Sequence, residues 1–248
     1  MSDDFKQGLQ VALLNSRSNL VDSPPISNIQ SLQDLNGYGC WCNFNDNNIH
    51  KGKGLAQDST FDLACRNLRH GYECAQLDSG LDSDCKPWNV TYNSALFCEK
   101  DILESCCETF NKNSDGSRND CAYFACLTEN HFVKDIINLV VKDGESLDET
   151  LVWENGFDAN EECVPVQAAT TISNLLTTED TLETTVSSSN GDSYSNVTET
   201  KQCCGDYPHR YAYKSQNGSR DCCNGHIYST SLYLCCEDGT TAIACDLF

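Results

Sequence analysis

The fold that we expect is decided by two stretches, Tyr38-Gly39-Cys40-Trp41-Cys42 and Phe61-Asp62-Leu63-Ala64-Cys65-Arg66-Asn67-Leu68-Arg69-His70-Gly71-Tyr72. The first places two cysteines in a turn that contains glycine. The second repeats apolar residues at the spacing of one helix face: Phe61, Ala64, Cys65, Leu68 and Tyr72. Ser59 stands where an N-cap is expected, with Asp62 three residues later as in a capping box. We therefore predict a cysteine-rich turn followed by a helix over residues 59–73.

A second helix is predicted from about Asn119 to Val141. Its apolar positions form one stripe: Cys121, Phe124, Ala125, Phe132, Ile136, Leu139 and Val140. The segment Lys142-Asp143-Gly144 ends it with a basic residue and then glycine, as is typical of a helix C-terminus. Residues 3–15 carry the pattern of a shorter amphipathic helix.

Cysteine is abundant, with 18 in 248 residues and several adjacent pairs. This pattern indicates a disulfide framework formed in an oxidising compartment. Zinc is the alternative, but the sequence lacks the usual ligand spacing. No stretch is apolar enough to cross a bilayer. N-glycosylation sequons at Asn89, Asn196 and Asn217 agree with our expectation of a secreted glycoprotein.

The chain is strongly acidic, with 37 acidic and 16 basic residues and a net charge of −21. Nucleic acids and anionic lipid surfaces bind to basic patches, so this composition argues against both as partners. It suits calcium, mineral faces or basic proteins. The simpler alternative is a soluble acidic surface without a specific partner.

The turn and the first helix resemble the calcium loop and first long helix of secreted phospholipase A2. That family's helix reads Asp-X-Cys-Cys-X-X-His-Asp-X-Cys-Tyr. Aligned without gaps, Asp62, Cys65 and Tyr72 match this motif. The family's catalytic His falls on Leu68 and its calcium-binding Asp on Arg69. The second helix begins Cys121-Ala122-Tyr123-Phe124-Ala125-Cys126-Leu127-Thr128-Glu129, similar to the family's Cys-X4-Cys-X-Cys-Asp, with Thr128 and Glu129 in place of its last two residues.

The resemblance implies calcium-dependent hydrolysis of phospholipid, which needs a His base and a carboxylate that holds the ion. Leu68 cannot accept a proton, and the guanidinium of Arg69 repels calcium. We therefore predict no catalytic residue and no cofactor, with only weak, diffuse calcium binding. The loop residues Trp41, Asn43 and Asn45 are a remnant without a confident ligand set. In the alternative register His70 becomes the base, but the metal ligand then falls on Gly71.

The resemblance also implies disulfide pairs and a small β-wing between the two helices. It pairs Cys42 with Cys65 and Cys40 with Cys163. It pairs Cys121 with Cys74 or Cys85, and Cys126 with Cys106 or Cys107, and spacing does not decide between them. Two further disulfides of the family map to Ala64 with Asp135 and to Gly71 with Thr128. In each of these pairs, both cysteines are replaced in this chain.

We predict three domains. The resemblance assigns residues 1–165 to a phospholipase A2-like domain, and composition predicts a Ser/Thr-rich linker at 166–201. Residues 202–248 are expected to be a di-cysteine module, which resembles galaxin-like matrix and skeletal proteins. The module's cysteines are Cys203, Cys204, Cys222, Cys223, Cys235, Cys236 and Cys245. Adjacent cysteines rarely bond each other. With seven cysteines here and eleven before, one bond should join the modules, or two chains.

The predicted fold class is mainly α and disulfide-rich, with a phospholipase A2-like antiparallel helix pair, a small β-wing and a cysteine-rich C-terminal module. The predicted function is that of a secreted, non-catalytic protein with a structural, adhesive or mineral-associated role. Its expected partners are the extracellular matrix or other copies of itself. Two alternatives remain open: a calcium-dependent phospholipase A2 that uses His70, and a soluble extracellular ligand or toxin-like binder.

Overall fold

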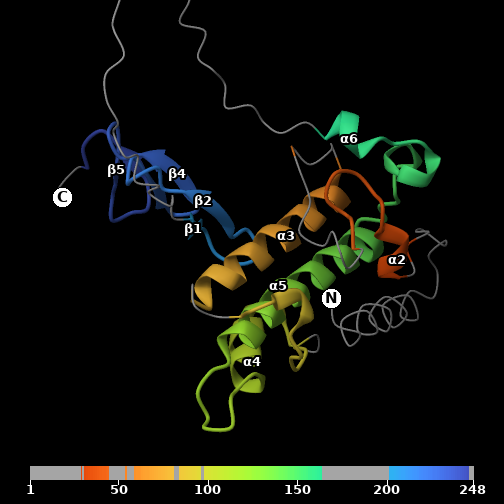
Figure 1. Cartoon of the computed structure of the whole chain (residues 1–248), viewed down its shortest axis with the longest axis horizontal. Coiled ribbons are helices and arrows are strands. Elements are labelled where there is room, and N and C mark those ends of the chain that lie inside the picture. The colour runs from red at the N-terminus through yellow and green to blue at the C-terminus, as the bar shows by residue number, and fades with distance from the viewer. Residues whose placement is uncertain are drawn as a thin grey trace, which may run out of the picture.

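A computed structural model describes residues 29, 31–44, 54, 59–80, 84–95, 98–163 and 201–245. Outside these ranges lie the helix predicted over residues 3–15, Asn45 and Asn196, and residues 166–200 of the linker predicted at 166–201. Two long helices dominate the chain, α3 (Thr60–Asp78) and α5 (Asp120–Ile137) (Figure 1). A π-helical turn, Asn138–Lys142, continues α5. The shorter α-helices are α2 (Leu32–Leu35), α4 (Leu103–Phe110) and α6 (Ala159–Glu162).

The two long helices pack side by side and antiparallel, which confirms the predicted pair (Figure 1). At the start of α3, the Thr60 hydroxyl donates a hydrogen bond to Glu145, which lies beyond the C-terminal end of α5. Further along α3, the Tyr72 hydroxyl donates to Glu129 in the middle of α5. The two helices therefore run in opposite directions.

The apolar core divides into two clusters along α5. The first joins the turn at residues 38–42 and α3 to the C-terminal half of α5, and it includes Leu68, Phe132 and Ile136. The second packs α4 against the N-terminal half of α5, around Leu103 and Ala125. Of the stripe predicted for the second helix, Ala125, Phe132, Ile136 and Val140 are buried in these clusters, whereas Cys121, Phe124 and Leu139 are half-buried.

The predicted β-wing is wrong for the described residues between the helices, 84–95 and 98–119. These residues form 3₁₀ turns at Pro87–Asn89 and Lys100–Ile102, then α4, and only an isolated bridge between Lys112 and Arg118. The α4 segment lacks the alternation of a strand, and its buried Leu103 and Cys107 stand one helical turn apart.

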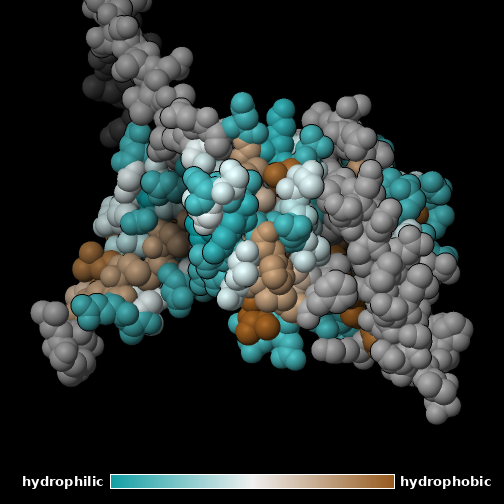
Figure 2. All heavy atoms as spheres, turned by 90° about the horizontal axis from the view of Figure 1, so that it is seen from below, coloured by the Kyte–Doolittle hydropathy of each residue, from teal (hydrophilic) through white to brown (hydrophobic). Residues whose placement is uncertain are grey.

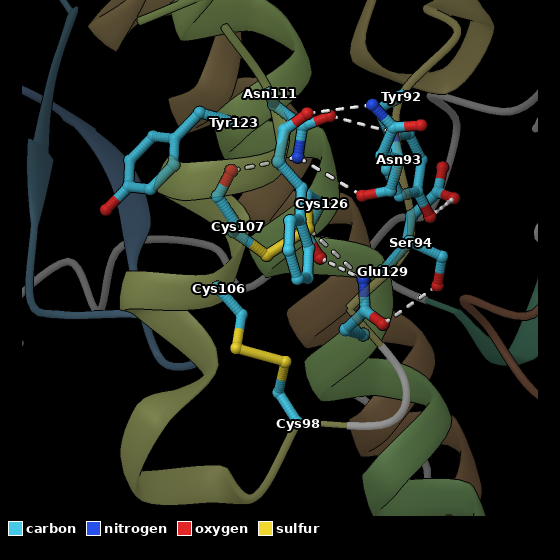
Figure 3. Close-up of a disulfide and its surroundings, with 12 residues drawn as sticks. Tyr92, Asn93, Ser94, Cys98, Cys106, Cys107, Asn111, Tyr123, Cys126 and Glu129 are labelled. Atoms are coloured by element: carbon cyan, nitrogen blue, oxygen red, sulfur yellow. Dashed lines mark hydrogen bonds between the residues drawn. A yellow bond between two sulfur atoms is a disulfide. The ribbon is translucent and has the colours of Figure 1, made fainter.

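The Asn111 side chain fixes the C-terminal end of α4 (Figure 3). Its Nδ2 donates to the carbonyls of Cys107 and Asn93, at 2.9 and 3.2 Å, and its Oδ1 accepts from the backbone N–H of Asn93 at 2.7 Å. Asn111 is nearly fully buried, and these bonds satisfy its side-chain amide, as a buried polar group requires.

Three small antiparallel hairpins form the C-terminal part (Figure 1). They pair β1 (Lys201–Cys204) with β2 (Tyr211–Lys214), β3 (Arg220–Cys223) with β4 (His226–Ser229), and β5 (Leu234–Cys235) with β6 (Thr241–Ala242). Lys201 belongs to β1, so the sheet begins one residue before the predicted module boundary. Asn224 and Gly225 turn the second hairpin with φ values of 47° and 80°, as an Asn-Gly turn between two strands requires. β1 and β2 pack on α3.

All 18 cysteines are bonded, in nine disulfides. Cys42–Cys65 and Cys40–Cys163 form as the resemblance implied. Of the alternatives left open, Cys121 bonds Cys85 and Cys126 bonds Cys107, and Cys98 bonds Cys106 nearby (Figure 3).

The expected bond between the N-terminal and C-terminal parts lies within one chain. Cys74, on α3, bonds Cys203, on β1. Each adjacent cysteine pair in the C-terminal part sends one bond backward and one forward, through Cys204–Cys222, Cys223–Cys235 and Cys236–Cys245.

Candidate functional site

The turn that carries Trp41 is held against α3 by a buried carboxylate. Asp62 is fully buried, and its Oδ1 accepts a hydrogen bond from the backbone N–H of Trp41 at 2.8 Å. Gly39 approaches so closely, with φ of +57°, that an added Cβ would lie 2.5 Å from Asp62 Cγ. Ser59 does begin α3, but its hydroxyl hydrogen-bonds the Tyr38 hydroxyl at 2.8 Å and forms no cap bond. The predicted capping box is therefore wrong, because Asp62 is committed to the turn.

Leu68, the position at which the resemblance expects a catalytic His, is part of the core. Its side chain is 2% exposed and lies in the cluster that contains Phe132 and Val133 of α5. An aliphatic side chain there packs the two long helices together and offers no group for proton transfer.

Arg69, the position at which the resemblance expects a calcium-binding Asp, places a positive charge on the loop that contains Asn43. Its Nη2 donates a hydrogen bond to the carbonyl of Asn43, and its guanidinium lies 5.5 Å from the centroid of the Phe44 ring. Burial lowers the pKa of Arg69 to about 10, so the side chain remains charged at neutral pH. The carbonyl of Asn43 in the remnant loop is therefore already bound to a positively charged side chain.

The alternative base, His70, is enclosed by aromatic rings. It packs against Trp41 with a centroid distance of 5.2 Å, and Tyr211 of β2 meets it edge-on at 6.3 Å. Arg66 Nε donates to its Nε2 at 3.4 Å. Burial lowers the pKa of His70, and the charge of Arg66 adds to that effect. Within the described residues, no carboxylate hydrogen-bonds this ring to orient it as a general base.

A buried carboxyl group connects α3 with α5. Glu129 is fully buried, accepts from the Tyr72 hydroxyl through Oε1 at 2.5 Å, and accepts from the Tyr92 hydroxyl through Oε2 at 2.7 Å. Burial raises the pKa of Glu129 to about 7, although both hydrogen bonds oppose the shift. The sequence motif singled out Tyr72 and Glu129. It did not identify Tyr92, because no helical spacing relates this loop residue to Glu129.

The C-terminal part is fastened to the end of α3 by polar contacts as well as by the Cys74–Cys203 bond. Arg210 holds Asp78 through two hydrogen bonds of 2.8 Å, from Nε to Oδ2 and from Nη2 to Oδ1. Lys201 Nζ pairs with Glu73 Oε1. In the same interface, β1 and β2 pack on α3, and Tyr211 of β2 lies against His70.

The remaining predicted site residues are dispersed. Asn89 and Asn217 are exposed, in a 3₁₀ turn and in the turn after β2, so both sequons in the described part are accessible. Across the described ranges, no group of three or more His, Cys, Asp or Glu side chains could hold a metal ion. The same ranges contain no helix with the length and apolar character of a membrane span.

Comparison of the chain with protein-family models, curated proteins and solved structures finds no match.

Proposed function

We propose that this chain is a secreted, non-catalytic protein with a structural or adhesive role, built on a degenerate phospholipase A2-like helix pair. The observation that carries the proposal is the contact between the Arg69 guanidinium and the Asn43 carbonyl. In the phospholipase A2 resemblance, a carboxylate on the helix and carbonyls on the loop share a calcium ion. Here a side-chain cation takes the place of that arrangement.

Electrostatics argue against calcium at this position. Two unit charges 4 Å apart interact by about 4 kcal/mol at an effective dielectric constant of about 20. Replacing a carboxylate by Arg69 removes an attraction of that order and adds a repulsion, and calcium carries two charges. Loop carbonyls alone do not offset such a loss, so calcium binding is expected to be weak, spread over the acidic surface and reduced by salt.

Several features support a structural or adhesive role. The nine disulfides suit an extracellular protein that must persist in an oxidising environment. The C-terminal hairpins expose apolar side chains (Leu232, Tyr233, Leu234 and Ile243), and Figure 2 shows apolar atoms on this part of the surface. Such a surface is suited to contacts with matrix proteins or with other copies of the chain. In this proposal residues 1–165 are the helical domain, 166–201 the linker and 202–248 the adhesive module.

The enzyme alternative relies on His70. This side chain packs between Trp41 and Tyr211 and so joins two parts of the chain. Burial also lowers its pKa. Neither of these contacts supplies the carboxylate that would orient a base. The third alternative, a soluble ligand or toxin-like binder, differs from our proposal in its prediction that the chain stays free in solution.

The catalytic part of the proposal is tested with phospholipid vesicles. The purified chain should release no fatty acid in the presence of calcium, and His70→Gln should behave as the unchanged chain does. An active secreted phospholipase A2 provides the positive control. Calcium-dependent release that is lost in the His70→Gln variant would restore the enzyme hypothesis.

The structural part needs a separate measurement. When the chain is secreted by cultured cells, we expect a large fraction in the insoluble extracellular layer and less in the medium. Replacing Leu234 and Ile243 by Ser should move the chain into the medium without changing its circular dichroism. A chain found only in the medium would favour the soluble ligand instead.

A further inference from the structure

The three C-terminal hairpins repeat one arrangement around an adjacent cysteine pair. The pair lies within β1 and within β3, and in the third hairpin it begins in β5 and ends directly after it. The two residues before the pair occupy equivalent positions: Lys201-Gln202 in the first hairpin, Arg220-Asp221 in the second and Tyr233-Leu234 in the third. The third hairpin is therefore apolar at positions where the first two are polar.

The apolar side chains of the third hairpin are exposed. Tyr233 and Leu234 are 42% and 54% exposed, and Leu232, which precedes them, is 64% exposed. Ile243 is 81% exposed and follows Ala242, which pairs with Leu234 across the hairpin. We call Leu232, Tyr233, Leu234 and Ile243 the third-hairpin patch, and Figure 2 shows apolar side chains on this part of the surface. Exposed apolar groups that gather in one place mark interaction surfaces.

Within the chain, each hairpin packs against the one before it. The Tyr211 hydroxyl of β2 donates a hydrogen bond to the Gly225 carbonyl in the turn of the second hairpin at 3.0 Å. In the turn of the third hairpin, Gly239 lies so close to Asn224 of the second that an added Cβ would be 3.1 Å from the Asn224 Cβ. The surface that covers a hairpin in this part of the molecule is therefore another hairpin.

The first hairpin is already covered by the helical part. Its strands β1 and β2 pack on α3, and the Cys74–Cys203 bond holds them there. The hairpins then follow one another away from α3, and β5 lies at the far end of this part of the molecule (Figure 1). The first hairpin is therefore not available to a second copy of the chain, whereas the third hairpin is.

We propose that the third hairpins of two copies of this chain pack against each other and form a symmetric dimer. No member of the third-hairpin patch is charged, so the two patches meet without repulsion between like charges. Because both copies contribute the same surface, the contact closes at two copies and does not extend into a filament. The packing continues the hairpin-on-hairpin contacts within the chain. This inference rests on the proposed adhesive role and names its partner as a second copy.

The dimer is expected to be weak and to depend on salt. An interface between two short hairpins lies at the low end of specific interfaces, below about 1,200 Å² in total, which corresponds to a Kd in the micromolar range. The net charge of −21 on each copy opposes association over a distance, and salt screens this repulsion. The dimer should therefore tighten as salt is raised, whereas an ionic contact with a basic protein would weaken.

The test is sedimentation equilibrium of the full chain, from low to high micromolar concentration. We expect an equilibrium between monomer and dimer, with a Kd that falls severalfold when sodium chloride is raised to a physiological concentration. A monomer at every concentration would overturn the proposal. Oligomers that continue to grow beyond the dimer would also overturn it, because a symmetric contact closes at two copies.

Variants locate the contact. The double variant Leu234→Ser, Ile243→Ser should weaken the dimer at least about tenfold, because two apolar side chains are lost from the interface. The matched control Leu63→Ser, Ile102→Ser changes the same residue types in the helical part, where they are 46% and 48% exposed, and should leave the Kd unchanged. Circular dichroism verifies that each variant is folded. An equal loss of affinity in both variants would contradict the assignment.

Hydrogen exchange identifies the protected residues. The amides of residues 232–244 should exchange more slowly at high than at low protein concentration, and those of α5 should exchange equally fast. Protection that spares residues 232–244 would contradict the proposal. A monomeric chain that sediments with phosphatidylcholine vesicles would overturn the dimer and assign the patch to a lipid surface.

The dimer and the proposed structural role can fail separately. A monomeric chain that still collects in the insoluble extracellular layer would overturn the dimer and leave the structural role in place. A dimer that stays in the culture medium would support this inference and contradict the structural role.

Discussion

Gly71 of α3 and Thr128 of α5 touch so closely that a Cβ placed on Gly71 would lie 3.4 Å from Thr128 Cβ and 2.6 Å from its Cγ2. These are the two positions at which the phospholipase A2 resemblance expects a disulfide that this chain lacks. Disulfide-bonded cysteines have Cβ atoms about 3.5–4.5 Å apart. Gly71 and Thr128 therefore lie at about the separation that a disulfide spans, with a glycine and a threonine filling the space.

The first prediction follows from that geometry. In the double variant Gly71→Cys, Thr128→Cys, the new cysteines should bond to each other and stabilise the chain by about 3 kcal/mol. Non-reducing peptide mapping detects the bond, and denaturation measures the gain. Gly71→Ala alone should destabilise the chain, because its methyl group meets Thr128 Cγ2, and Thr128→Ser should relieve that loss. Free thiols at both positions would show that the helices do not approach as described.

The second prediction concerns the pH dependence of stability. The pKa of Glu129 is raised from 4.5 to about 7, so the folded chain binds a proton that the unfolded chain releases between these values. The resulting stabilisation is present below about pH 4.5 and is lost as the pH rises through 7, by at most about 3 kcal/mol. Glu129→Gln should remove this slope in the free energy of unfolding.

The hydrogen bond from Tyr92 provides a control for that measurement. This bond lowers the pKa of Glu129, so Tyr92→Phe should move the loss of stability to higher pH without abolishing it. A wild-type chain whose stability follows the same pH curve as Glu129→Gln would contradict the assignment.

The third prediction separates a half-buried ion pair from an exposed one. The side chains of Arg210 and Asp78 are 24% and 19% exposed, whereas those of Arg118 and Asp120 are 40% and 45% exposed. A double-mutant cycle with Arg210→Gln and Asp78→Asn should give a coupling energy of about 1–2 kcal/mol, and the same cycle on the exposed pair less than about 0.5 kcal/mol. Equal couplings would mean that the Arg210 contact is as solvated as a surface pair.

The fourth prediction tests the covalent bond between the two parts of the chain. A site for a sequence-specific protease is inserted between Thr181 and Leu182. After cleavage, the fragments should migrate together on a non-reducing gel, because Cys74 bonds Cys203. They should separate when both cysteines are replaced by Ser. Separation of the wild-type fragments without a reductant would exclude the bond.

Local patterns predicted the helices, because the apolar residues of α3 and α5 recur at helical spacing and both faces are buried. The resemblance predicted the two bonds that fasten the turn at Cys40 and Cys42. The β-wing was wrong, because it was inferred from the resemblance and not from any alternation in the residues themselves.

Contacts between distant segments that the resemblance does not relate could not be predicted from the sequence. Asp62 has the spacing of a capping residue, but the turn at Trp41 takes its carboxylate. Nothing in the helix pattern places Tyr211 beside His70, 141 positions away, since that contact depends on how the hairpins dock on α3. The pairing of Cys74 with Cys203 likewise depends on docking, and the odd numbers of cysteines predicted only that some such bond exists.

The back-and-forward bonding of adjacent cysteines also determines how the C-terminal part would carry mechanical load. A force applied at Cys245 is transmitted through its disulfide to Cys236 and then through one peptide bond to the adjacent cysteine. The same alternation of disulfide and peptide bond continues through Cys223 and Cys204 and ends at Cys74 on α3. The peptide between bonded partners, with sequence separations of 18, 12 and 9 residues, is bypassed and bears no tension. Stretching therefore cannot lengthen the chain between α3 and Cys245 as long as the sulfur bridges remain, so this part of the molecule acts as a nearly inextensible tether.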